Sequence, residues 1–202
     1  MCNIHLTFSL ECRDEENSLQ FETNFFGPVR LIRSLLPGMR ARKIGTIVNV
    51  SSIAGQDGLP SCGMYAGSKS ALEGLSEALA REIEPFNISV LIVEPGMFRT
   101  HFMTAAQVTK KGVSEPYSGG AVEKMVQAFG NLNGTQRGDP EKGVARIFEV
   151  VTGTGAAGAL KGNILRLPLG PDCLVRFEKK AKSVSADLEA AREAAMSTDI
   201  GG

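Results

Sequence analysis

The feature that most constrains the fold is the alternation of short apolar runs with long amphipathic stretches. Residues 46–50 and 88–93 read TIVNV and ISVLIV, and turn residues bound both runs. Strands that are apolar throughout, rather than at every second position, are typical of parallel sheets buried on both faces. Apolar positions recur at helical spacing in the stretches around them, at 14–42, 65–84, 120–129, 140–151 and 172–196. The pattern predicts an α/β domain with a parallel sheet and helices on both faces.

Further details of the pattern predict individual elements. Residues 163–167 complete the set of buried strands, and residues 4–10 alternate apolar and polar side chains as a half-buried strand does. The Pro-Gly pair at 37–38 predicts a break or a bend in the first helix. In the helix at 172–196, apolar residues repeat at spacings of three and four. This seam predicts packing on the body of the protein or on a partner subunit, and the body is favoured.

Composition excludes several classes of partner. The chain has 202 residues, of which 43% are hydrophobic and 22% charged, as in ordinary globular proteins that form one domain. Its 22 basic and 22 acidic residues cancel, so no overall charge attracts nucleic acid or an anionic membrane. No apolar stretch approaches the ~18 residues of a membrane span, and the first residues do not read as a signal peptide. We therefore expect a cytoplasmic protein with neither nucleic-acid nor membrane partners.

Some patterns resemble binding motifs but fail on context. The G-x-G-x-x-G at 153–158 follows a predicted helix and precedes a predicted strand, which is the reverse of the order in dinucleotide-binding turns. Residues 63–70 miss the glycine spacing of a P-loop by one residue. The four cysteines stand at positions 2, 12, 62 and 173, and these spacings are not typical of a metal site. We expect reduced thiols, no metal, and a plain helix-to-strand connection at 153–158.

One constellation of side chains fits its context. Tyr65 begins the helix at 65–84 and Lys69 follows four residues later, so the two side chains share a helix face. A nearby ammonium group favours the phenolate and lowers the pKa of the tyrosine from about 10 toward working pH, as a tyrosine acid or base requires. Ser52 follows the strand at 46–50, at the carboxyl edge where parallel α/β sheets bind ligands. Its hydroxyl is placed there to hold a carbonyl oxygen that Tyr65 protonates.

The chain resembles the short-chain dehydrogenase/reductase family through four ordered motifs. ETNFFG carries Asn24, GTIVNVSSIAG carries Ser52, YAGSK carries Tyr65 and Lys69, and VEPGMFRT carries Pro95, Gly96 and Thr100. The resemblance implies an incomplete doubly wound, Rossmann-like parallel sheet with a long C-terminal helix, in one partial domain. Its expected parts are an atypical leader at 1–13, a catalytic-motif core at 14–100, a substrate-lid region at 101–140 and a helix–strand–helix segment at 141–202.

The resemblance also implies a chemistry. It is hydride transfer between a nicotinamide cofactor and an alcohol or carbonyl compound, with NADP favoured over NAD by family analogy alone. Tyr65 is the implied general acid or base, Ser52 orients the substrate oxygen, Lys69 supports Tyr65 and binds the ribose, and Asn24 holds a water of a proton relay. The implied cofactor contacts are Asn24, Tyr65, Lys69, Pro95, Gly96, Phe98 and Thr100. A homodimer or homotetramer is the implied assembly.

The chain departs from the family pattern in its first part. A glycine-rich TGxxxGxG turn, a residue that selects the adenosine ribose and an NNAG-like strand end are absent from the sequence. We therefore expect the truncated latter half of a larger domain, lacking roughly 90 residues, with little or no activity as written. The strand at 46–50 is then an open edge, which the leader strand at 4–10 is expected to cover. The alternative is a non-catalytic protein of the same fold that dimerises through the helices at 14–42 and 65–84.

Overall fold

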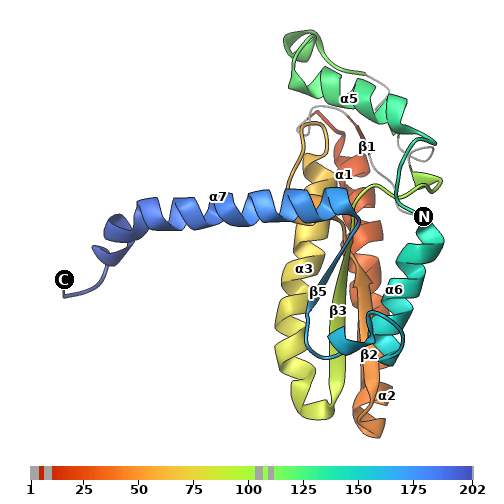
Figure 1. Ribbon diagram of the computed structural model, residues 1–202. Helices are drawn as coiled ribbons and strands as arrows, with labels where there is room; N and C mark the ends of the chain where they lie inside the picture. The colour runs from red at the N-terminus through yellow and green to blue at the C-terminus, as the bar shows by residue number, and fades with distance from the viewer. Residues whose placement is uncertain (1–4, 7–10, 103–106, 109–111, 202) are drawn as a thin grey trace.

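A three-stranded parallel sheet forms the centre of the protein. The computed structural model describes residues 5–6, 11–102, 107–108 and 112–201 (Figure 1). The strand order in the sheet is β2 (Gly45–Val50), β3 (Ile88–Pro95) and β5 (Arg166–Leu169). The register pairs Val48 with Leu91 and Val93 with Leu167. The predicted α/β architecture with a parallel sheet is confirmed.

The helices follow the predicted stretches closely. They are α1 (Asp14–Phe21), the π-helical segment η1 (Glu22–Phe26), α2 (Gly27–Arg42), α3 (Gly63–Ile83), α5 (Ala121–Leu132), α6 (Pro140–Thr152) and α7 (Pro171–Met196). Short 3₁₀ turns lie at η2 (Ile53–Gly55), η3 (Glu84–Phe86), η4 (Glu115–Tyr117) and η5 (Gly158–Leu160). Among the described residues, every helix is too short or too polar to cross a bilayer.

Helices cover both faces of the sheet because successive side chains of β3 point to opposite sides. Val90 packs with Leu79 and Ile83 of α3, in a cluster that α2 also joins. Leu91 and Val93 lie in another buried cluster, together with Val150 of α6. Figure 1 shows α3 and α6 flanking the strands on opposite sides. The core therefore fixes the carboxyl ends of β2 and β3 at one edge of the sheet.

The first helical run differs from the prediction in two respects. Of the predicted break or bend at Pro37, the break does not occur: the helix continues to Arg42, because Leu36 and Met39 on either side pack against the core cluster of Ile47. The run contains instead a π-helical segment, Glu22–Phe26, that the sequence pattern does not reveal. Such segments often occur at functional sites, and this one carries Asn24.

The described residues of the leader strand do not cover the open edge of the sheet, contrary to the prediction. Residues His5–Leu6 form β1 and pair in parallel with β4 (Gln107–Val108), in a ladder separate from β2. The rest of the expected strand at 4–10 lies outside the described residues. Within the part of the chain that the structure describes, β2 pairs only with β3. His5 and Leu6 thus pair with the strand at 107–108 and not with β2.

Two expectations for the C-terminal part are wrong in detail. The last strand begins at Arg166 rather than at 163, because Gly162 has a positive φ of 73° and Asn163 still closes a turn onto the carbonyl of Leu160. The seam of α7 does not pack on the body: Leu188 is 66% exposed, and α7 extends away from the sheet in Figure 1. The spacing of its apolar residues predicts an amphipathic helix but does not show which surface packs against the apolar face.

The glycine pattern at 153–158 is a helix-to-strand connection, as predicted. Gly153 ends α6 with a φ of 76°, in the left-handed region that favours glycine. A Cβ at Gly158 would lie 2.6 Å from the carbonyl carbon of Gly153, so the close turn requires glycine there. The pattern therefore has a packing role.

Candidate active site

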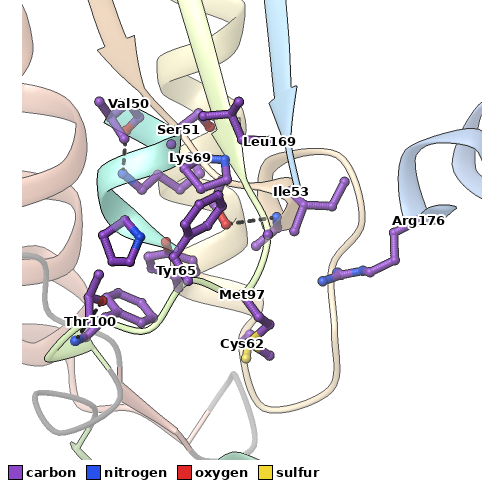
Figure 2. Close-up of a pocket in the computed structure, with 18 of the residues that line it drawn as sticks. Val50, Ser51, Ile53, Cys62, Tyr65, Lys69, Met97, Thr100, Leu169 and Arg176 are labelled. Atoms are coloured by element: carbon purple, nitrogen blue, oxygen red, sulfur yellow. Dashed lines mark hydrogen bonds between the residues drawn. The ribbon is translucent and has the colours of Figure 1, made fainter. Parts of the chain in front are cut away.

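The carboxyl ends of β2 and β3 form one side of a cavity of about 380 Å³. Figure 2 shows Tyr65, Lys69 and Thr100 among the side chains around it. The structure brings together nearly all of the predicted site residues there: Ser52, Tyr65, Lys69, Pro95, Gly96, Phe98 and Thr100. The rest of the wall is largely apolar, with Ile53, Leu59, Met97, Phe102, Phe129 and Leu169 among its residues.

Ser52 is held where β2 leads into the next turn. Its backbone is extended and its Oγ caps η2 by accepting a hydrogen bond of 3.1 Å from the amide of Ala54. A serine at such a position is favoured because its hydroxyl satisfies a free amide at the start of the turn. Because the Ser52 hydroxyl accepts this hydrogen bond, it can still donate its own proton to a group in the cavity.

Tyr65 and Lys69 lie on the same face of α3, as their spacing predicts. The Nζ of Lys69 is 5.9 Å from the centroid of the Tyr65 ring, and both residues are buried. The ammonium group donates a hydrogen bond of 2.9 Å to the carbonyl of Val50, near the end of β2 (Figure 2). This bond fixes the cation beside the tyrosine, and a buried cation favours a neighbouring phenolate.

Asn24 does not line this cavity but lies behind it. Its Nδ2 donates to Ser68 Oγ at 3.1 Å, and Ser68 in turn donates to the backbone carbonyl of Tyr65 at 2.7 Å. Asn24 lines a neighbouring cavity of about 500 Å³, whose wall also includes Lys69 and Val50. Lys69 and Val50 line both cavities, so Asn24 lies in a cavity that adjoins the one of Tyr65.

A partly buried carboxylate cluster that the sequence pattern does not reveal contacts Ser51 beside the site. We use this name for Glu73, Glu77, Glu94 and Arg166. One guanidinium nitrogen of Arg166 lies 2.8 Å from Glu73 and 2.6 Å from Glu94, and the other contacts Glu77. Ser51, the neighbour of Ser52, donates its hydroxyl proton to Glu73. The cluster therefore ties the ends of β2 and β3 to α3 and β5.

The carboxyl group of Glu94 holds its proton unusually tightly. Burial, and then the nearby carboxylate of Glu73, raise the pKa of Glu94 to about 7 against the opposing effect of Arg166. One of its oxygens, Oε2, is buried without a hydrogen-bond partner among the described residues. Three carboxyl groups thus surround a single guanidinium, and a proton on Glu94 relieves the excess of negative charge.

This raised pKa predicts a pH dependence of stability. A carboxyl group with a raised pKa in the folded state contributes stability that is present below its ordinary value of 4.5 and is lost as pH rises through about 7. We expect the free energy of unfolding to fall by about 2 kcal/mol from pH 5 to pH 8 because of this group. Glu94→Gln should flatten that slope in urea titrations at several pH values. The exposed Glu178→Gln serves as a control, and an unchanged slope in Glu94→Gln would contradict the assignment.

The N-terminus of α7 contacts the site from two directions. Asp172 accepts a hydrogen bond of 2.7 Å from the amide of Met97, and Arg176 pairs at 2.7 Å with Asp57. These contacts join residues 75 and 119 positions apart, so no local pattern reveals them. The only local pattern that hints at the Asp172 contact is an acidic residue in the first turn of a predicted helix.

Cys62 also lines the cavity, and it is a free thiol like Cys12 and Cys173.

Comparison with known proteins decides the family. The family model described as short chain dehydrogenase matches residues 4–111, more than half of the chain. The chain belongs to the short-chain dehydrogenase family. A 3-ketodihydrosphingosine reductase from Bacteroides thetaiotaomicron is 38% identical to it over 169 residues, which cover 82% of this chain and 59% of the relative.

Solved structures of short-chain dehydrogenases share the fold. One from Streptomyces avermitilis is 35% identical, with a TM-score of 0.83, and the match covers 98% of this chain and 68% of that one. A 4-hydroxyisoleucine dehydrogenase complexed with NADH is 26% identical, with a TM-score of 0.59 over 82% of this chain and 62% of that one. The chain spans 48–59% of the length of three curated relatives.

Proposed function

We propose that this chain is the catalytic portion of an NAD(P)-dependent oxidoreductase that interconverts an alcohol and a carbonyl compound. The observation that carries the proposal is the convergence of Ser52, Tyr65 and Lys69 on one largely apolar cavity. A cavity of about 380 Å³ is within the range that small-molecule sites occupy. Family membership supports oxidoreductase chemistry, and the three side chains supply the groups that it needs.

Each of the three side chains has a distinct role in the proposal. The Ser52 hydroxyl donates a hydrogen bond to the substrate oxygen and so orients it. Tyr65 donates its phenolic proton to that oxygen during carbonyl reduction and removes it during alcohol oxidation. Lys69, held by the carbonyl of Val50, favours the phenolate and keeps the tyrosine ready to exchange its proton. Asn24 supports α3 from the π-helical segment by donating to Ser68 of α3, whose hydroxyl bonds to the carbonyl of Tyr65.

The residues of the cavity fit a nicotinamide ring and its ribose. Gly96, Phe98 and Thr100 line one side of it, and Lys69 supplies a buried ammonium that can donate to ribose hydroxyls. The hydroxyl of Thr100, which accepts a hydrogen bond from the amide of Phe102, keeps its proton for a carboxamide oxygen. When bound, the nicotinamide supplies or accepts the hydride. The NADH complex of the 4-hydroxyisoleucine dehydrogenase supports a cofactor of this kind.

The test is a turnover assay on two proteins. The first is the 202-residue chain, from which we expect little turnover because its sequence contains no TGxxxGxG turn for the cofactor pyrophosphate. The second is a fusion in which the part of the Streptomyces avermitilis enzyme outside the structural match precedes the chain. Loss of NADH or NADPH absorbance with a panel of apolar ketones and aldehydes is expected for the fusion. A folded fusion that binds neither cofactor and reduces no carbonyl would overturn the proposal.

A second candidate function is assembly without catalysis, through the helices α1 to α2 and α3. The observation in its favour is the exposure of large apolar side chains on the first of these segments: Leu19, Phe26, Leu31 and Leu35 are 46–60% exposed. Such a face is typical of a surface that a second copy covers. Sedimentation velocity, combined with the turnover assay, distinguishes the oxidoreductase from the assembly protein. A fusion that forms dimers but shows no turnover supports only assembly without catalysis.

A further inference from the structure

The first turns of α7 contact two loops that both line the cavity. Asp172 and Arg176 are four residues apart, so their side chains leave the same helix face. Asp172 Oδ2 accepts the amide hydrogen of Met97 at 2.7 Å. Arg176 donates through Nε to Asp57 Oδ2 and through Nη2 to the backbone carbonyl of Asp57, both at 2.7 Å. We call these contacts the α7 clamp.

Each loop held by the α7 clamp carries part of the cavity wall. Met97 follows Pro95 and Gly96 at the end of β3, on the side that we assign to the cofactor. Asp57 lies in the loop between η2 and α3, which leads through Cys62 to Tyr65. Figure 2 shows Arg176 reaching from α7 toward this loop. The first turns of α7 therefore contact both the cofactor side and the tyrosine side of the cavity.

The local sequence is adapted to the Asp172 carboxylate. A Cβ added at Gly96 would lie 2.4 Å from Asp172 Oδ2, so only glycine leaves room for the carboxylate beside the loop. Gly170, with a φ of 97°, begins the helix, and a Cβ there would lie 2.7 Å from Asp172 Oδ1. The thiol of Cys173 adds a further bond to the end of β3, donating to the carbonyl of Glu94 at 3.0 Å.

The Arg176 contact is specific to a guanidinium group. Its two nitrogens reach a carboxylate and a backbone carbonyl of the same residue, Asp57, which needs the fixed fork that lysine lacks. The pair is partly buried, with side chains 23% and 34% exposed, and Arg176 itself lines the cavity. Beyond Phe177, α7 is exposed to its end, so the anchoring of this helix is confined to its first turns.

We propose that Asp172 and Arg176 are positioning residues that hold the two loops at the spacing the reaction requires. The proposal rests on the proposed function, because it assigns the clamp to the cavity of Tyr65. Releasing either contact lets the loops separate and misaligns the cofactor side with Tyr65. Small misplacements of this kind lower the rate of the chemical step by about 10²-fold when orientation is critical. The predicted consequence is a fall in kcat larger than any rise in KM for the cofactor.

Cys62 provides a readout that does not depend on activity. It is 3% exposed in the loop that Arg176 holds, whereas Cys12, 9% exposed, precedes α1 outside the clamp. Opening of the loop should expose the buried Cys62 thiol to a thiol reagent. Burial raises the pKa of this thiol and the charge of Arg176 opposes that rise, so Asp57→Asn, which keeps Arg176, gives the cleaner readout. We expect maleimide to label Cys62 at least about 10-fold faster in Arg176→Gln and Asp57→Asn than in the native 202-residue chain. Arg176→Lys should be intermediate, because it keeps the charge but loses the fork.

Controls distinguish a local change from general unfolding. Arg192→Gln removes an exposed arginine from the far part of the same helix, and labelling of Cys62 should stay at the native rate. Labelling of Cys12, resolved by peptide mass spectrometry, should be unchanged in every variant. Equal acceleration at Cys12 and Cys62, or none at Cys62, would overturn the clamp.

The reaction itself gives the second readout, in the fusion described above. We expect kcat to fall about 10- to 100-fold in Arg176→Gln, with partial recovery in Arg176→Lys and no change in Arg192→Gln. An active fusion whose kcat is insensitive to Arg176→Gln overturns the positioning role. A fusion that is inactive with the native clamp overturns the proposed function, while the labelling of Cys62 in the 202-residue chain still decides whether the clamp holds the loop.

Discussion

Replacing Tyr65 with phenylalanine should lower carbonyl reduction by the fusion about 10²- to 10⁴-fold, the usual contribution of a general acid. The substitution removes only the phenolic oxygen and keeps the ring that packs 5.8 Å from the ring of Phe102. Cofactor affinity and the melting temperature should therefore change little. Steady-state kinetics with NADH and NADPH, paired with thermal unfolding of each variant, give the comparison.

The matched control removes a hydroxyl group far from the cavity. Ser34 lies exposed on α2, where its hydroxyl bonds to the carbonyl of Leu31, and Ser34→Ala should keep full turnover. A fusion that reduces carbonyl compounds at the native rate with Tyr65→Phe would remove the central residue from our account of the chemistry. It would not affect the family assignment, which rests on the sequence match.

Replacing Arg166 with methionine should cause a large loss of stability. Methionine fills much of the space but leaves the buried carboxylates of Glu73 and Glu94 without their counter-ion. Removing one partner of a buried ion pair costs about 3–5 kcal/mol, because an uncompensated charge stays behind. Urea unfolding of the 202-residue chain at pH 8 measures the loss. It should shrink at pH 5, since Glu94, whose pKa is raised to about 7, is then protonated and the repulsion is relieved.

The control for this prediction is an exposed ion pair. Arg192 contacts Glu189 at 3.0 Å, with both side chains about 70% exposed, and such pairs contribute little to stability. Arg192→Met should therefore leave the urea midpoint almost unchanged. If Arg166→Met is as stable as this control at pH 8, the carboxylate cluster does not hold the ends of the strands together.

Local patterns predict most of the fold and the centre of the site. The strands at 45–50 and 88–95 and the helix around Tyr65 follow from apolar periodicity and turn residues that act within a few positions. Because parallel strands end at one edge, the same patterns bring Ser52 near Tyr65 and Lys69. These features depend on short-range rules, and the structure bears them out.

Features that depend on distant partners could not be predicted. The π-helical segment places Asn24 against Ser68, 44 residues away, and nothing within Glu22–Phe26 indicates that contact. Arg166 meets its carboxylates across 72 to 93 residues. The seam of α7 was expected to be buried because periodicity reveals an apolar face but not its partner. Burial of a charged side chain depends on tertiary packing, which a single sequence does not encode in any local pattern.

The most direct test of the central claim follows the hydride itself. The fusion is incubated with an apolar ketone and with NADH or NADPH carrying deuterium on the transferable face of C4, and the alcohol product is analysed by mass spectrometry. We expect one deuterium on the carbinol carbon of the product in the native fusion, and loss of the labelled product in Tyr65→Phe. Alcohol formed without deuterium from either face of the cofactor, or labelled equally fast by Tyr65→Phe, would contradict the central claim.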